Sequence, residues 1–129
     1  MVQLVIADIP THHHFRITVP LHKNAMSTTR LNQLKAMLEE SPHDAFLLFA
    51  LAKEYEKLGE QETALRYYLH LEEHEPGYVG TYYHLGKLYE HIGEAGLALE
   101  TYDKGIEAAR RAGDQHAMGE LASAKMALE

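Results

Sequence analysis

The chain of 129 residues contains no cysteine, which excludes disulfides and thiolate metal sites. No apolar run approaches the roughly 18 residues that a membrane-spanning helix needs. The first residues lack a basic start, and Asp8 interrupts the apolar run there, so we expect no secretory signal. These absences fit a cytoplasmic protein without a membrane partner, although many exported proteins also lack cysteine.

The sequence signatures of catalysis are absent as well. There is no glycine-rich phosphate loop, no nucleophile elbow and no HExxH helix, so we expect neither enzymatic activity nor a cofactor. Residues 41–129 carry eight basic and sixteen acidic side chains, a net charge of −8, against +1 for residues 1–40. An acidic region repels phosphate backbones, and we therefore expect no nucleic-acid partner.

Residues 1–26 differ in composition from the rest of the chain. Two short β-branched runs, Val2–Ile9 and Phe15–Val19, are separated by Pro10 and three adjacent histidines. We predict that this segment is an N-terminal extension, disordered or peripheral, and that the helical domain covers residues 27–129. The alternative is a short β-hairpin laid against the helices.

From Ser27 onward the spacing of apolar residues is helical. Ser27 or Thr28 is a suitable cap for the first helix, and Asp44 and Asp114 for two later ones. Connections of two to four residues make neighbouring helices antiparallel. The predicted helices cover residues 28–40, 45–58, 61–75, 79–92, 95–112 and 115–128.

A 34-residue period runs through these helices. The recurring pairs are Leu48 and Tyr82, Leu51 and Leu85, Ala52 and Gly86, Tyr55 and Tyr89, Gly59 and Gly93, Ala64 and Ala98, and Tyr68 and Tyr102. A fixed period of this length indicates stacked helix-turn-helix units. Small residues in the pattern let the two helices of a unit approach closely, and the aromatic residues fill the core between them.

These residues resemble the tetratricopeptide repeat family, with Leu51-Ala52 and Leu85-Gly86 at its leucine-glycine pair and Pro76 at its closing proline. Gly105 departs from the family's usual alanine. The resemblance implies an all-α solenoid of antiparallel helix-turn-helix repeats wound into a right-handed superhelix. It implies full repeats at about residues 45–78 and 79–112, with a half-repeat helix at each end.

In this family the first helix of each repeat lines a concave groove that binds peptides. The resemblance therefore implies a protein-interaction module or small scaffold, with a protein or peptide partner. The predicted groove residues are Phe46, Phe49, Lys53, Lys57, Tyr83, Lys87 and His91, with Glu56, Gly80, Glu90, His116 and Ser123 beside them. Phenylalanines next to lysines suit a peptide with apolar anchors and an acidic group. Alternatively, the helix over residues 28–40 or the N-terminal segment covers both phenylalanines.

Two other functions remain open from the sequence. The first is self-assembly, possible through a terminal helix whose amphipathic face holds Met118, Leu121, Ala122, Lys125 and Met126. The second is a metal or pH sensor, because the chain has ten histidines and places His70 and His74 one helical turn apart. The sequence fixes no third ligand beside that pair, so we predict no metal site.

Overall fold

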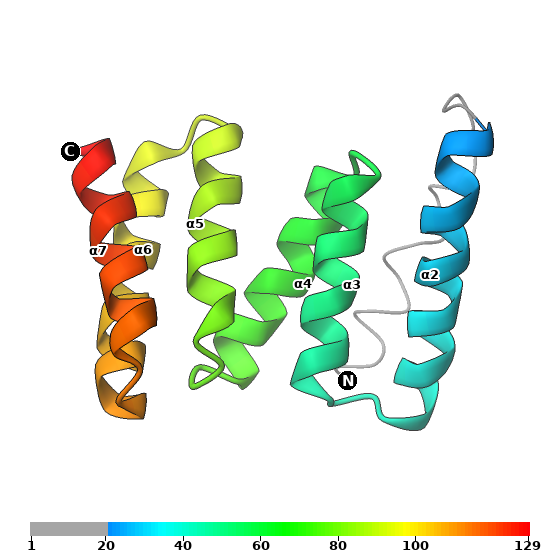
Figure 1. The fold of residues 1–129 in the computed structure, drawn as a ribbon, viewed down its shortest axis with the longest axis horizontal. Coiled ribbons are helices and arrows are strands. Elements are labelled where there is room, and N and C mark those ends of the chain that lie inside the picture. Colours follow the sequence, from blue (N-terminus) through cyan, green and yellow to red (C-terminus); the bar gives the residue numbers. More distant parts are fainter. Residues whose placement is uncertain (1–20) are drawn as a thin grey trace. The chain divides into compact units, whose positions relative to one another are not determined.

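The computed structural model describes residues 21–129, and side chains from Thr28 onward (Figure 1). All secondary structure in this range is helical, as the sequence predicts, and the described residues form no β-strand. None of the helices among them is both long and apolar enough to cross a lipid bilayer. The helices are α2 (Leu21–Glu40), α3 (Ala45–Lys57), α4 (Gln61–His74), α5 (Gly80–His91), α6 (Ala95–Ala112) and α7 (Gln115–Leu128).

The helices from α3 onward begin and end within one residue of their predicted bounds. The prediction for the first helix was wrong at its start: α2 begins at Leu21, and Ser27 and Thr28 lie inside it instead of capping it. The stretch before Ser27 contains leucine, lysine, alanine and methionine, which favour helix strongly enough to continue it upstream. The predicted strand-like runs and the three adjacent histidines fall outside the described residues.

Side chains and glycines define the helix ends. Asp44 Oδ1 accepts a hydrogen bond from Leu47 N at 3.2 Å at the start of α3, and Asp114 caps α7 in the same way. Both caps confirm the sequence prediction. The residues after α3, α5 and α6 include Gly59, Gly93 and Gly113, whose φ angles of 81°, 84° and 71° are left-handed. Glycine adopts this conformation without a steric penalty, so each helix ends in a tight reversal.

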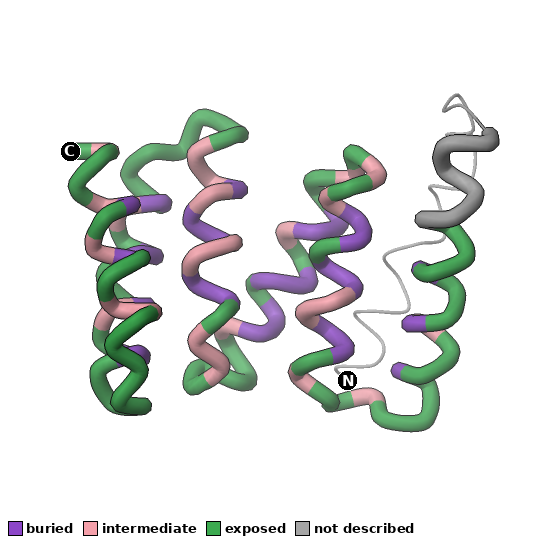
Figure 2. Tube along the Cα trace, viewed as in Figure 1, coloured by how far each residue is buried: buried purple, intermediate pink, exposed green. Residues whose placement is uncertain are grey.

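The described residues divide into two compact units, one up to Tyr67 and the other Tyr68–Glu129, with the division inside α4. In the first unit α2 packs against α3, and each helix turns one purple, buried side toward the core (Figure 2). Fully burying a leucine side chain contributes about 1.5–3 kcal/mol. The buried apolar residues of this unit are Leu31, Leu34, Leu38, Leu47, Leu48, Leu51, Ala52, Tyr55, Ala64 and Tyr67.

Aromatic packing connects α3 and α4 within the first unit. The rings of Tyr55 and Tyr67 are stacked, with centroids 5.5 Å apart and planes inclined by 19°. Burial raises the pKa of Tyr55 to about 12 and that of Tyr67 further still. Both hydroxyls therefore stay neutral at physiological pH, which suits side chains that are buried in a core.

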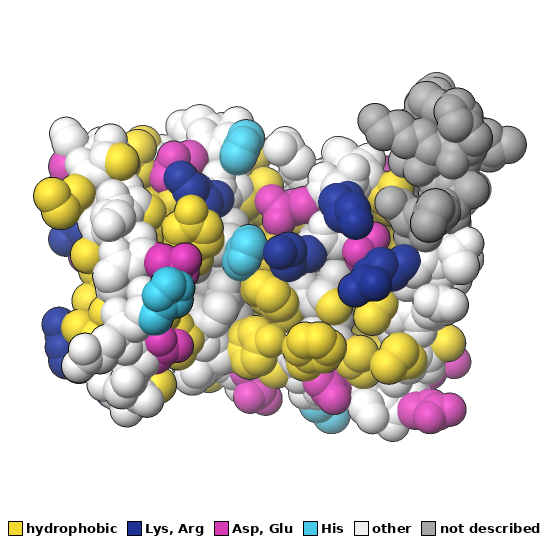
Figure 3. All heavy atoms as spheres, viewed as in Figure 1, with side chains coloured by type: hydrophobic (Ala, Val, Ile, Leu, Met, Phe, Trp, Pro, Cys, Tyr) yellow, Lys and Arg dark blue, Asp and Glu magenta, His cyan; other side chains and the backbone are white. Residues whose placement is uncertain are grey.

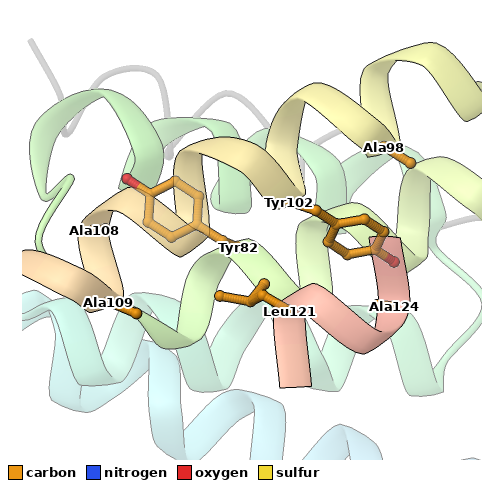
Figure 4. Close-up of a cluster of buried hydrophobic side chains, with 7 residues drawn as sticks. All are labelled: Tyr82, Ala98, Tyr102, Ala108, Ala109, Leu121 and Ala124. Atoms are coloured by element: carbon orange, nitrogen blue, oxygen red, sulfur yellow. The ribbon is translucent and has the colours of Figure 1, made fainter. Parts of the chain in front are cut away.

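In the second unit α6 packs against both α5 and α7. Its core cluster consists of Tyr82, Ala98, Tyr102, Ala108, Ala109, Leu121 and Ala124 (Figure 4). Glycines allow the close approach of the helices: a methyl group on Gly86 would overlap the ring of Tyr102, and one on Gly105 would overlap Tyr82 Cβ. The aromatic residues of the repeat are thus core, as the sequence indicates, although Tyr89 is only half-buried.

Candidate binding site

Four of the predicted groove residues share one side of α3, which we call the α3 face: Phe46, Phe49, Lys53 and Lys57. Their spacings of three and four residues place them in a row along the helix. Phe46 is 64% exposed, so α2 does not cover it. Phe49 is half-buried, and Lys53 and Lys57 are exposed. Figure 3 shows hydrophobic side chains gathered where α3 begins, with basic ones farther along the helix.

The corresponding residues of α5 form the α5 face: Tyr83, Lys87 and His91. Each lies 34 positions after Phe49, Lys53 and Lys57 respectively. Tyr83 and Lys87 are half-buried, and His91 is exposed, with its Nδ1 2.9 Å from the carbonyl oxygen of Lys87. Both faces therefore run from an aromatic residue to a basic one in the direction of the chain.

The same cation–π contact recurs on both faces. Lys53 Nζ lies 5.9 Å from the centroid of the Phe49 ring, and Lys87 Nζ lies 5.7 Å from that of Tyr83. At exposed sites such a contact contributes about 0.5–1 kcal/mol. Each lysine head is thus held beside an aromatic surface instead of moving freely through solvent, and the pair can offer an apolar contact and a cation together.

The α5 face opens into a cleft of about 690 Å³ between α5 and α7, which we call the α5–α7 cleft. Inside it, the imidazole of His116 lies 3.5 Å from a carboxylate oxygen of Glu120. The cleft therefore combines an aromatic ring, a lysine and a polar wall in one open space. Its lining residues are Tyr83, Lys87, Gln115, His116, Gly119, Glu120, Ser123 and Ala124.

The core behind α5 fixes the position of the cleft lysine. The hydroxyl of the buried Tyr102 donates a hydrogen bond to Glu90 Oε2, and the same oxygen lies 3.9 Å from Lys87 Nζ. Burial and this hydrogen bond raise the pKa of Tyr102, so its hydroxyl remains a donor across the physiological range. The chain of contacts from Tyr102 through Glu90 to Lys87 couples the core of the repeat to its exposed face.

The histidine pair weighed from the sequence lies on α4. The ring centroids of His70 and His74 are 4.4 Å apart, with His70 buried and His74 exposed. Within the part of the chain that the structure describes, no group of three or more histidine, aspartate or glutamate side chains is arranged to hold a metal ion. A pair of histidines alone gives an incomplete ligand set for zinc, which usually takes at least three protein ligands.

The sequence predicted that His116 and Ser123 of the terminal helix contribute to the binding surface. It did not predict their neighbours Glu120, Gln115 and Gly119. The helical spacing from His116 to Glu120 and Ser123 was the signal that could have found them. It also missed Arg30 of α2, which lies beside the α3 face through an ion pair with Glu54. How the α3 face and the α5 face combine into one groove stays a prediction.

Comparison with known proteins identifies related sequences. The sequence profile of the tetratricopeptide repeat family matches residues 79–111. A tetratricopeptide repeat domain protein from Salinibacter ruber is 45% identical, over 67% of this chain and 96% of its own, and its crystal structure superposes with a TM-score of 0.64. No protein with a curated description matches the sequence.

Two further solved structures resemble this one. Protein BPP2914 from Bordetella parapertussis is 28% identical and covers 76% of this chain and 85% of its own, with a TM-score of 0.66. PcrH, solved in complex with the chaperone binding region of PopD, has a TM-score of 0.72 over 84% of this chain and 82% of its own. At 14% identity the likeness to PcrH shows a common fold alone.

Proposed function

This chain belongs to the tetratricopeptide repeat family, and from that premise we propose that it is a protein-interaction module. In this proposal each unit offers a surface of its own to a segment of a partner protein: the α3 face in the first unit, and the α5 face with the α5–α7 cleft in the second. On the α3 face, apolar side chains of the segment contact Phe46 and Phe49, and polar groups contact Lys53. On the α5 face they contact Tyr83 and Lys87.

The observation that carries this proposal is the recurrence of one partly exposed aromatic–lysine pair in both repeats. Phe49 with Lys53 and Tyr83 with Lys87 make the same contact at the same position of the first helix. Fully buried residues such as Leu51 and Leu85 form the centre of the core, whereas Phe49 and Tyr83 are only partly buried at its edge. Partly exposed aromatic side chains beside a cleft are typical of binding surfaces.

The size of the cleft and the behaviour of a fold neighbour support the same function. Ligand sites in proteins usually have volumes of about 300–1,000 Å³, and the α5–α7 cleft falls within that range. PcrH was solved with a bound segment of another protein, PopD. The fold that the two chains have in common is therefore able to hold a partner segment.

A peptide display experiment tests the proposal. Random peptides are selected on the full chain, and the affinities of the selected peptides are then measured by titration calorimetry against variants. We expect Tyr83→Ala, and the double change Phe46→Ala with Phe49→Ala, to weaken binding by at least about tenfold, the effect of losing an interface hot spot. Circular dichroism should show unchanged helicity.

The matched control is Leu97→Ala, which also truncates a partly exposed apolar side chain but lies on α6 and belongs neither to the two faces nor to the cleft lining. Its affinity for the selected peptides should equal that of the parent chain. If the aromatic substitutions and the Leu97 substitution leave affinity equally unchanged, the binding surface has been assigned to the wrong residues.

A further inference from the structure

The lysine of the α5–α7 cleft has a carboxylate partner, whereas the carboxylate of the cleft has no cation beside it. Lys87 Nζ lies 3.9 Å from Glu90 Oε2 and 5.7 Å from the centroid of the Tyr83 ring. Glu120 pairs only with the imidazole of His116, at 3.5 Å, and an imidazole carries a charge only when it is protonated. The unmatched charge in the cleft is therefore negative.

The core of the repeat holds the partner of Lys87 in place. The buried hydroxyl of Tyr102 donates a hydrogen bond to Glu90 Oε2, the same oxygen that faces Lys87. The Glu90 side chain is only 26% exposed. A carboxylate that accepts a bond from a buried donor keeps its position better than one that only meets solvent. A ligand carboxylate that approached Lys87 would therefore compete with one already in place.

The other cations of the second unit are paired as well. Lys104, Arg110, Arg111 and Lys125 each form an ion pair with a carboxylate outside the cleft lining. A helix N-terminus also favours an anion, but at the start of α7 the carboxylate of Asp114 already caps the helix. An acidic ligand group thus meets neither an unpaired lysine or arginine nor an uncapped α7 in residues 68–129.

The second unit as a whole is acidic. Residues 68–129 contain eleven aspartates and glutamates against five lysines and arginines, which gives a net charge of −6 out of −7 for the whole chain. A field of this sign speeds the encounter with basic segments and repels acidic ones. The field of the unit and the carboxylate of the cleft therefore favour the same sign of ligand charge.

The cleft offers a basic side chain both of the contacts that it needs. The Glu120 side chain is 53% exposed, so a charged head group can reach its oxygens. A carboxylate can accept two parallel N–H bonds from a guanidinium group. The half-buried ring of Tyr83 lines the same cleft and supplies apolar surface for the methylene groups of lysine or arginine.

From these contacts we infer that the α5–α7 cleft takes a lysine or arginine side chain of the partner segment and disfavours an aspartate or glutamate. Glu120 contacts the charged head, Tyr83 contacts the aliphatic part, and Glu90 prevents Lys87 from attracting an acidic group. The sequence favoured an acidic group because it shows the lysine but not the contact between Tyr102 and Glu90. The inference rests on the proposed function and deepens it, because it names the charge of the partner.

NMR titrations of the isotope-labelled full chain test the inference. Three synthetic peptides on a glycine-serine background carry a central leucine that is flanked on both sides by arginine, glutamine or glutamate. Shifts of the Gly119 and Ser123 amide signals report binding in the cleft. We expect the arginine peptide to bind there about three- to tenfold more tightly than the glutamine peptide, and the glutamate peptide to bind most weakly. The differences should shrink in about 1 M salt, where charges are screened within about 3 Å.

Charge-removing variants identify the groups responsible. Glu120→Gln should remove most of the preference for the arginine peptide. Glu100→Gln is the matched control, because it removes an exposed carboxylate of α6 that does not line the cleft. It should leave the preference intact.

A second pair of variants tests whether Glu90 neutralises Lys87. Glu90→Gln removes the charge, and Tyr102→Phe keeps the ring in the core but removes the hydroxyl that holds Glu90. Both should raise the affinity of the glutamate peptide severalfold, since Lys87 becomes available. A purely structural role of Tyr102 would instead lower the affinities of all three peptides alike. Circular dichroism checks that each variant is folded.

Each unfavourable outcome has a distinct meaning. If the glutamate peptide binds in the cleft as tightly as the arginine peptide, the inference is wrong and the proposed function stands. The same holds if none of the three peptides shifts the cleft signals while display-selected peptides bind the chain. If selection on the full chain yields no binding peptide, and these three also fail, both the proposed function and the inference are wrong.

Discussion

At the scale of single residues, Gly105 shows how packing decides a position that family resemblance alone would misjudge. The family usually has alanine here, and alanine also favours helix. In this chain Tyr82 of α5 packs so closely that a methyl group on Gly105 would overlap Tyr82 Cβ and crowd Leu121. Because Tyr82 Cβ is fixed to its backbone, the side chain cannot rotate away from the added methyl group.

We therefore predict that Gly105→Ala destabilises the protein by about 1–3 kcal/mol, the usual cost of overpacking a core. Gly119→Ala is the matched control, because Gly119 also lies within a helix but has nothing within 4 Å of the added methyl group. That change should stabilise the protein by up to about 1 kcal/mol through helix propensity. Urea unfolding measures both. If both variants gain stability alike, Tyr82 does not pack as closely as described.

The position of the lysine on the α5 face likewise depends on contacts that the sequence pattern does not show. The helical pattern places Lys87 on the exposed side of α5, but only the structure shows that Tyr102 and Glu90 hold it there. Glu90 lies three residues along the same helix, but Tyr102 comes from α6, so no local spacing reveals that contact. The contact of Arg30 with Glu54 also cannot be predicted from local spacing, because it joins α2 to α3.

At the scale of elements, the helices differ in how their first turns are satisfied. Asp114 Oδ1 accepts a hydrogen bond from Ala117 N at 3.0 Å, whereas Glu94 at the start of α6 makes no side-chain cap bond. An unsatisfied backbone donor costs stability when no side chain replaces the missing helical acceptor. The two helix starts therefore offer a direct comparison within one unit.

We predict that Asp114→Ala lowers the free energy of unfolding by about 1 kcal/mol, and that Asp114→Asn retains most of it. Glu94→Ala should change the same quantity by less than about 0.5 kcal/mol, as for an ordinary surface substitution. Chemical unfolding followed by circular dichroism measures all three variants. Equal losses for Asp114→Ala and Glu94→Ala would mean that the cap bond contributes nothing to α7.

At the scale of the whole molecule, the chain consists of two units that each carry one aromatic–lysine pair. The division lies within α4, because Tyr67 packs on α3 while Tyr68 stacks on His84 of α5. The sequence period places the repeat boundaries between pairs of helices. In the structure, by contrast, one helix, α4, belongs partly to each compact unit. A repeat in sequence and a compact unit in space need not coincide.

The proposed function needs no second copy of the chain, so we predict a single species with the mass of one chain in sedimentation velocity. The alternative from the sequence, self-assembly through α7, predicts a mass that rises with concentration. Met126, at 73% exposure, is the most exposed large apolar side chain of that helix. If the mass does rise, and Met126→Ser restores the single species, self-assembly replaces partner binding as the leading function.

The sequence by itself determined the helices from α3 onward, the caps Asp44 and Asp114, and the family. These follow from local patterns and a fixed period, which act through neighbours along the chain. It also predicted the residues of the α3 and α5 faces, whose part in binding stays a prediction. The predicted cytoplasmic location and the N-terminal extension stay predictions.

Only the tertiary structure decided the contacts between helices. It showed that Phe46 is uncovered, that Gly105 is required by Tyr82, that Glu54 anchors Arg30 and Lys57, and that α7 closes a cleft with α5. Such contacts join residues distant in sequence, and their geometry depends on how side chains interlock. A periodic pattern fixes which side of a helix turns inward, but packing across helices fixes which atoms meet.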